Sequence, residues 1–140
     1  MMCCAAVLAW AAVLSVVDIR QHRLPNLLTI PGAALILLGA VACGRGLPAL
    51  LGAAALGAVY LVIHLLDPAG LGGGDVKLAL ALGALTGALG SAVWVLAALG
   101  APMLTAVAGL VAALRHRGRV VPHGPSMCAV SLLAAALAVP

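Results

Sequence analysis

Charged side chains are nearly absent from this chain, and their scarcity constrains the fold more than any other feature. Of 140 residues, 66% are hydrophobic and 7% are charged, whereas about a quarter of the residues in an ordinary soluble domain carry a charge. A soluble domain of this length has too high a surface-to-volume ratio to bury so much apolar surface. The composition therefore excludes a soluble enzyme, a disordered tail and a disulfide scaffold, and it predicts an integral membrane protein.

Apolar segments fill most of the chain and are separated by short polar stretches. A membrane-spanning helix needs about 20 mostly apolar residues. Dividing the chain at its charges, glycines and prolines gives six segments, 1–17, 27–43, 47–66, 76–89, 91–114 and 123–140. We therefore predict an all-α integral membrane protein, a bundle of six transmembrane helices forming a single domain over residues 1–140.

The boundary between the fourth and fifth segments is the hardest to place, because residues 76–114 form one apolar stretch. One helix of these 39 residues would be about 58 Å long, well beyond the bilayer core of about 30 Å. Gly90 offers a break, with Ser91 as the N-cap of the fifth helix, and residues 100–102 are the alternative. The first break leaves a fourth helix of about 21 Å, which is tolerated where a protein admits water part-way into the bilayer.

The basic residues orient the segments, because cytoplasmic loops are enriched in Lys and Arg. One basic residue, Arg45, lies outside the first, third and fifth loops and their flanks. The other six lie in those loops or beside them: Arg20, Arg23, Lys77, Arg115, Arg117 and Arg119. This asymmetry places the three loops in the cytoplasm and both termini outside, in a multi-pass protein of the inner (plasma) membrane. Since no single basic face results, we expect the lipid bilayer as a partner and no nucleic acid.

The cysteines and histidines do not form a pattern typical of a metal site. The four cysteines lie in apolar segments without a CxxC pair, and the four histidines lack the spacing of metal ligands. No serine has a base beside it in the sequence. We therefore predict neither a metal nor an organic cofactor.

The chain has three carboxylates, and two of them are candidates for shared chemistry. Asp18 ends the first segment, where a helix C-terminus repels a negative charge, and Asp75 precedes the fourth, where an Asp often caps a helix. Both lie on the cytoplasmic face, and two nearby carboxylates can share one proton, so that one activates a water and the other acts as an acid. The alternatives are a solvated Asp18 paired with Arg20 or Arg23, and Asp75 as a simple cap. Asp67 precedes a proline and is read as a turn former.

A run of glycines lies directly before Asp75. Glycine permits close approach of another backbone, so residues 72–74 fit an extended substrate lying beside a carboxylate. A Walker A phosphate loop would need Gly-Lys-Ser/Thr where this chain has Gly-Asp-Val-Lys. A flexible loop without a ligand is the remaining alternative. Further along, Gly83 and Gly87 have the GxxxG spacing that favours close packing of two helices.

Three motifs together resemble one family. Residues 72–75 (GGGD), followed by Val-Lys-Leu, resemble the GxGD segment of the type IV prepilin peptidases, membrane aspartyl proteases that trim pilin-like precursors. Residues 18–26, from an Asp to a Pro-Asn pair, are similar to the first catalytic segment of that family. Residues 121–125 resemble its Pro-aromatic-Gly-Pro element, with His123 in place of the aromatic residue. The motifs occur in the family order and extend over most of the chain.

The resemblance implies that Asp18 and Asp75 are the catalytic pair of an aspartic endopeptidase. It implies that the protein removes a short basic leader from a pilin-like precursor on the cytoplasmic side. The residues expected to contact this substrate are Gly72, Gly73, Gly74, Asn26, Lys77, Pro122, Gly124 and Pro125. Only eight residues, 19–26, join the first two segments, so the CxxC-containing insert of family members that also N-methylate their product is missing. We therefore expect the peptidase activity alone.

Two other functions stay open from the sequence. One is a general intramembrane GxGD protease, which would cleave apolar helices that lack a basic leader. The presenilin-like members of that class pair GxGD with Tyr-Asp, whereas Tyr60, the one tyrosine here, precedes Leu61. The other is a small non-enzymatic transport or assembly subunit whose acids line a polar path. The sequence also leaves a homo-oligomer open.

Overall fold

The computed structural model describes residues 2–21, 25–68, 70–114 and 123–138, and this part of the chain is helical without any strand. The helices within it are α1 (Met2–Gln21), α2 (Asn26–Ala42), α3 (Gly46–Leu66), α4 (Gly73–Leu89), α5 (Ser91–Leu114) and α6 (Gly124–Ala138). The prediction of an all-α chain with six helices is confirmed for these residues. Pro122, Arg23, Arg115, Arg117 and Arg119 lie outside them.

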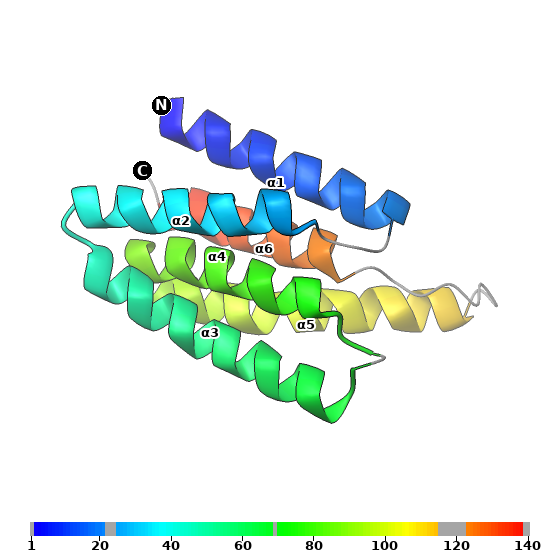
Figure 1. Ribbon diagram of the computed structural model, residues 1–140. Coiled ribbons are helices and arrows are strands. Elements are labelled where there is room, and N and C mark those ends of the chain that lie inside the picture. The colour runs from blue at the N-terminus through cyan, green and yellow to red at the C-terminus, as the bar shows by residue number, and fades with distance from the viewer. Residues whose placement is uncertain (1, 22–24, 69, 115–122, 139–140) are drawn as a thin grey trace.

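Helix α4 is the central element of the bundle, and the other helices surround it (Figure 1). It packs against α2, α3, α5 and α6, whereas α1 lies at the edge, against α6 and α2. One face of α4 is fully buried, with Leu78 and Leu82 at its centre. Helix α4 is short and apolar on nearly all sides. A helix of this composition is expected to be enclosed by its neighbours, as α4 is.

The closest helix contact joins α3 to α4 and depends on glycine. A Cβ added to Gly83 would lie 2.5 Å from the carbonyl oxygen of Gly52, and one added to Gly87 would lie 2.6 Å from the carbonyl oxygen of Pro48. Such distances are too short for a side chain, so the two backbones touch directly. The GxxxG spacing of Gly83 and Gly87 therefore has the packing role that the sequence predicted.

The apolar stretch 76–114 is divided at Gly90. This residue has a φ of 134°, in a region that favours glycine, and its carbonyl accepts the backbone N–H of Trp94. The cap position of α5 is therefore taken by Gly90, and the prediction that Ser91 is the N-cap is wrong, since Ser91 is already the first helical residue. The alternative break at residues 100–102 is also wrong, because α5 continues through Pro102.

Large apolar side chains cover much of the outside of the bundle. Leu27, Leu66 and Leu137 are each at least 75% exposed, and others like them occur along α2, α3 and α5. Two of the described helices, α3 and α5 over Ser91–Val111, are long and apolar enough to cross a membrane, and α2 and α6 are apolar but shorter. An exterior of this kind is favourable in contact with lipid and unfavourable in contact with water.

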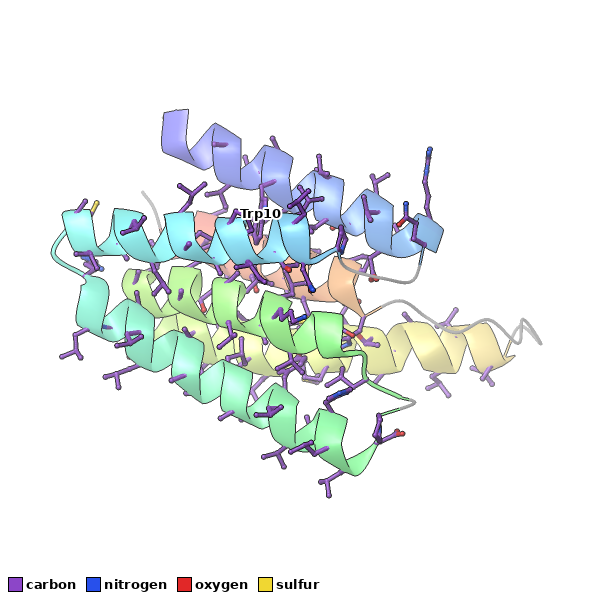
Figure 2. The ribbon with its side chains drawn as sticks, in the orientation of Figure 1. Trp10 is labelled. Carbon is purple, nitrogen blue, oxygen red and sulfur yellow. The ribbon has the colours of Figure 1, made fainter. Side chains whose placement is uncertain are left out.

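Helix α1 is held to the bundle by Trp10, which lies between α1 and α2 (Figure 2). The indole Nε1 donates a hydrogen bond of 2.9 Å to the carbonyl oxygen of Leu28. The ring occupies the space that a side chain at Gly32 would fill. This pair joins α1 to α2, whereas the more extensive packing of α1 is against α6.

Candidate active site

The polar motifs meet at one end of the bundle, although they are spread along the chain. There α1 and α3 end, and α2, α4 and α6 begin (Figure 1). At the opposite end Arg45, in the turn between α2 and α3, donates a 2.9 Å hydrogen bond to the carbonyl oxygen of Ala88 in the last turn of α4. The up-and-down order of the helices thus separates the end that carries the aspartates from the end that carries Arg45.

Asp18 lies in the last turn of α1 and faces the beginning of α6. Its side chain is buried, 6% exposed, and its Oδ2 accepts the backbone N–H of Gly124 at 3.2 Å. The N-terminus of α6 carries partial positive charge, which offsets the repulsion from the C-terminus of α1. Asp18 is therefore not a solvated surface acid, as one alternative from the sequence held.

Gly124 allows this contact. A Cβ at this position would lie 2.6 Å from Oδ2 and 3.1 Å from Cγ of Asp18. The carboxylate therefore lies directly on the backbone of α6, at the step where the helix begins. Of the expected substrate-contacting residues, Gly124 is thus in contact with Asp18 itself.

Asp75 is the third residue of α4, and the cap position belongs to Gly72. The interpretation of Asp75 as the N-cap is wrong, because α4 begins at Gly73, before the apolar segment 76–89. The carboxylate instead accepts a hydrogen bond from the backbone N–H of Gly72. This is the half of a capping box in which an acidic side chain at the third helical position reaches back to the cap residue.

The two carboxyl groups are close enough to affect one another. Asp75 lies at the polar end of α4, outside the apolar segment, and burial is the main cause that raises its pKa to about 6 from an ordinary 3.8. The charge of Asp18 raises this pKa as well, whereas the hydrogen bond from Gly72 lowers it. The thiol of Cys128, which is buried on α6, lies within electrostatic range of both acids. The two like charges therefore disfavour the state in which both carboxyl groups are ionised.

Two side chains of α3 and its C-terminal turn hold the glycine-rich loop before Asp75. Asp67 Oδ1 accepts the backbone N–H of Gly70 at 3.0 Å, which confirms its predicted role as a turn former. His64 Nδ1 lies 2.6 Å from the carbonyl oxygen of Leu71, so this nitrogen carries the proton and donates it. The ring also lies beside Gly73. His64 had no signal in the sequence, because its partner is a backbone carbonyl.

Asn26 and Lys77 pair with each other at this end of the bundle. Lys77 Nζ donates a 2.6 Å hydrogen bond to Asn26 Oδ1, which joins the second turn of α4 to the first residue of α2. Residues two apart on a helix point to nearly opposite sides, so Lys77 faces α2 while Asp75 faces the other helices. The structure thus brings Asn26 and Lys77 together on a side of α4 different from that of the carboxyl pair.

His123 directly precedes Gly124, the residue that contacts Asp18. The partners of its side chain could not be found from the sequence. Its Nε2 lies 2.8 Å from the hydroxyl of Tyr60 on α3, and its Nδ1 lies 2.6 Å from Oγ1 of Thr105 on α5. Tyr60 also interacts electrostatically with Asp75. The following residues, Gly124 and Pro125, form the first turn of α6.

The described residues contain no metal-ligand cluster, and a groove at the other end of the bundle is apolar. No group of three or more His, Cys, Asp or Glu side chains is close enough there to hold a metal ion. A groove of about 440 Å³ between α3, α4 and α5 lies at the end opposite the aspartates and is lined by apolar side chains around Gly52, Gly87 and Trp94.

Comparison with known families identifies the family of this chain. The model of the type IV leader peptidase family matches residues 5–139, nearly the entire chain. The chain belongs to the type IV leader peptidase family. No curated protein and no solved structure gives a match. The family assignment makes this chain a leader-peptidase-like protease, and together with the apolar helices it identifies a membrane protein.

Proposed function

We propose that this leader peptidase is an aspartyl endopeptidase that removes the short basic leader of pilin-like precursors. Asp18 and Asp75 are its catalytic residues. The observation that carries the proposal is the approach of these two acids from α1 and α4, close enough for the charge of one to raise the pKa of the other. Such a pair supplies a base and an acid without a metal or a covalent intermediate.

The surroundings of the two acids assign the roles. Asp18 acts as the base, because it faces the N-terminus of α6 and the Gly124 N–H, both of which favour a carboxylate. Asp75 acts as the acid, because its pKa of about 6 lets it retain a proton. Asp18 removes a proton from a water, the water oxygen attacks the scissile carbonyl carbon, and Asp75 protonates the carbonyl oxygen. The diol then returns a proton to Asp75 while the C–N bond breaks, and the leaving amine takes the proton held by Asp18.

The substrate lies as an extended strand against the glycine backbone. Gly72, Gly73 and Gly74 approach it without side chains, and Gly124 and Pro125 bound it on the α6 side. The Asn26–Lys77 pair contacts the segment that enters past α2. The apolar helix of the precursor, which follows the cut, lies in the bilayer beside the apolar exterior of the bundle.

The same proposal includes the orientation in the membrane. Six helices span the inner membrane, both termini lie outside, and the aspartates face the cytoplasm. The basic residues near the aspartate end, among them Arg20 and Lys77, support this orientation, as does the lone Arg45 at the other end. A basic leader that remains in the cytoplasm then meets the enzyme on the side where the catalytic pair lies.

The test is cleavage of a co-expressed precursor with a basic leader by wild type, Asp18→Asn, Asp75→Asn and Asp67→Asn. Asparagine keeps the size of the side chain and removes the acid or base. Asp67→Asn is the matched control, because Asn still accepts the Gly70 N–H and Asp67 is exposed. We expect cleavage by wild type and by the control, and none by the other two at equal membrane levels.

Other outcomes select the other functions. Cleavage of an authentic precursor by either Asp18→Asn or Asp75→Asn at the wild-type rate would exclude the paired-aspartate mechanism. Cleavage of apolar helices that lack a basic leader, at equal rates, would indicate a general intramembrane protease instead. Solute flux that survives both substitutions, without any cleavage product, would indicate a transport subunit.

A further inference from the structure

His123 joins three helices beside the carboxyl pair. Its ring lies between Tyr60 of α3 and Thr105 of α5, with contacts of 2.8 and 2.6 Å to its two nitrogens. The carbonyl oxygen of His123 accepts the backbone N–H of Met127 at 3.1 Å, so His123 is also the N-cap of α6. The residue that determines where α6 begins is therefore bound through its side chain to two other helices.

With a neutral imidazole, the hydrogen bonds of this network have one arrangement that satisfies every contact. The hydroxyl of Thr105 donates its single proton to the carbonyl oxygen of Ala101 at 3.1 Å, so Nδ1 of His123 must be the donor to Thr105. Nε2 is then the acceptor, and the hydroxyl of Tyr60 donates to it. Burial lowers the pKa of His123, which favours the neutral imidazole that this arrangement needs.

Each end of the network reaches one of the two acids. The residue after His123 is Gly124, whose N–H donates to Asp18 Oδ2. Tyr60, which is 4% exposed, interacts electrostatically with Asp75. The network therefore connects the backbone that binds Asp18 with a side chain that lies within electrostatic range of Asp75.

We propose that His123 is a positioning residue for the catalytic pair. Its ring, bound by Tyr60 and Thr105, places the first N–H of α6 against Asp18 and at the same time fixes the position of the Tyr60 hydroxyl. The inference rests on the proposed function. His123 itself does not touch the reacting atoms, so its removal changes the distance between the acids and not the affinity for the substrate.

The first test separates positioning from simple stabilisation. His123→Phe and Tyr60→Phe each remove the bond between α3 and α6. We expect each to lower kcat for leader cleavage about tenfold or more, since a misplacement of about 1 Å costs about 100-fold, with KM within about twofold. The double variant should be no slower than the slower single variant, because both changes break one contact. His123→Gln, which can still accept from Tyr60, should recover part of the rate.

The matched control is Trp94→Phe at the other end of the bundle. Trp94 Nε1 donates a 3.0 Å hydrogen bond to the carbonyl oxygen of Gly52, so this variant also loses a bond between two helices. It should lower the unfolding temperature and leave kcat unchanged. If His123→Phe behaves in the same way, with wild-type kcat at a temperature where both are folded, His123 has only a structural role and the proposal is wrong.

A second test does not depend on cleavage. In the full-length protein labelled with ¹⁵N-glycine, the Gly124 amide resonance should shift on Asp18→Asn, because the acceptor of its hydrogen bond changes. In a His123→Phe background this shift should be strongly reduced. An undiminished shift would overturn the positioning role, whether or not the protein cleaves any precursor. A wild type that cleaves nothing, with the shift lost in His123→Phe, would contradict the proposed function and support the positioning of Asp18.

Discussion

Gly124→Ala is the smallest change that disturbs the carboxyl pair without altering an acid. The added Cβ would lie 2.6 Å from Asp18 Oδ2, whereas ordinary contact begins at 3.4 Å. Asp18 or the start of α6 must therefore retreat by about 0.8 Å. A displacement of this size at a reacting group lowers a rate by about 100-fold, so we expect a fall of about that size in kcat for leader cleavage.

The fold itself should tolerate this change. Gly124 does not have the positive φ that disfavours other residues, and alanine favours helix by up to about 1 kcal/mol relative to glycine. The unfolding temperature should therefore stay near that of wild type. The matched control is Gly39→Ala, where nothing lies within 4 Å of the added Cβ, and which should keep full activity.

The assay is single-turnover cleavage of a purified precursor in lipid vesicles, with the three proteins at equal concentration. It separates the chemical step from substrate binding and product release. If Gly124→Ala cleaves as fast as Gly39→Ala, the contact between Asp18 and the start of α6 does not belong to the active arrangement. The base role given to Asp18 would then have to be abandoned.

Four further results are expected. Because Asp75 must hold a proton and its pKa is about 6, kcat/KM should fall as the pH rises above about 6, approaching tenfold per pH unit. In Asp18→Asn the pKa of Asp75 should be lower, because one of the two causes that raise it is gone; infrared absorption of the protonated carboxyl measures this, and an unchanged pKa would separate the two acids. Gly83→Ala should destabilise the bundle by about 1–3 kcal/mol, seen as a lower unfolding temperature, because its Cβ meets the backbone of α3; a wild-type temperature would contradict that packing. His64→Phe should lower kcat about tenfold and increase proteolysis of the glycine-rich loop, since its 2.6 Å bond to that loop is lost, and equal proteolysis of both proteins would argue against this role.

Features set by neighbouring residues were predictable from the sequence. Apolar segments bounded by Pro25, Gly90 and Asp67 became helices that end or begin at those residues. The GxxxG spacing of Gly83 and Gly87 predicted a close helix contact, because a helix places residues four apart on one face. The meeting of the motifs at one end of the bundle was also predictable from the sequence. Short connections make successive helices run in opposite directions, so the first, third and fifth loops lie at the same end.

Other features arise where two distant segments touch, and these only the tertiary structure decided. By its place in α1, Asp18 sits at a helix end that repels it, and the N-terminus of α6 reverses that effect. The partners of His123, Tyr60 and Thr105, lie on two other helices, and no spacing along the chain connects them. A helix signal is local, because its hydrogen bonds join residues four apart. The electrostatics of the site depend on which helix ends face one another, which is settled when the bundle packs.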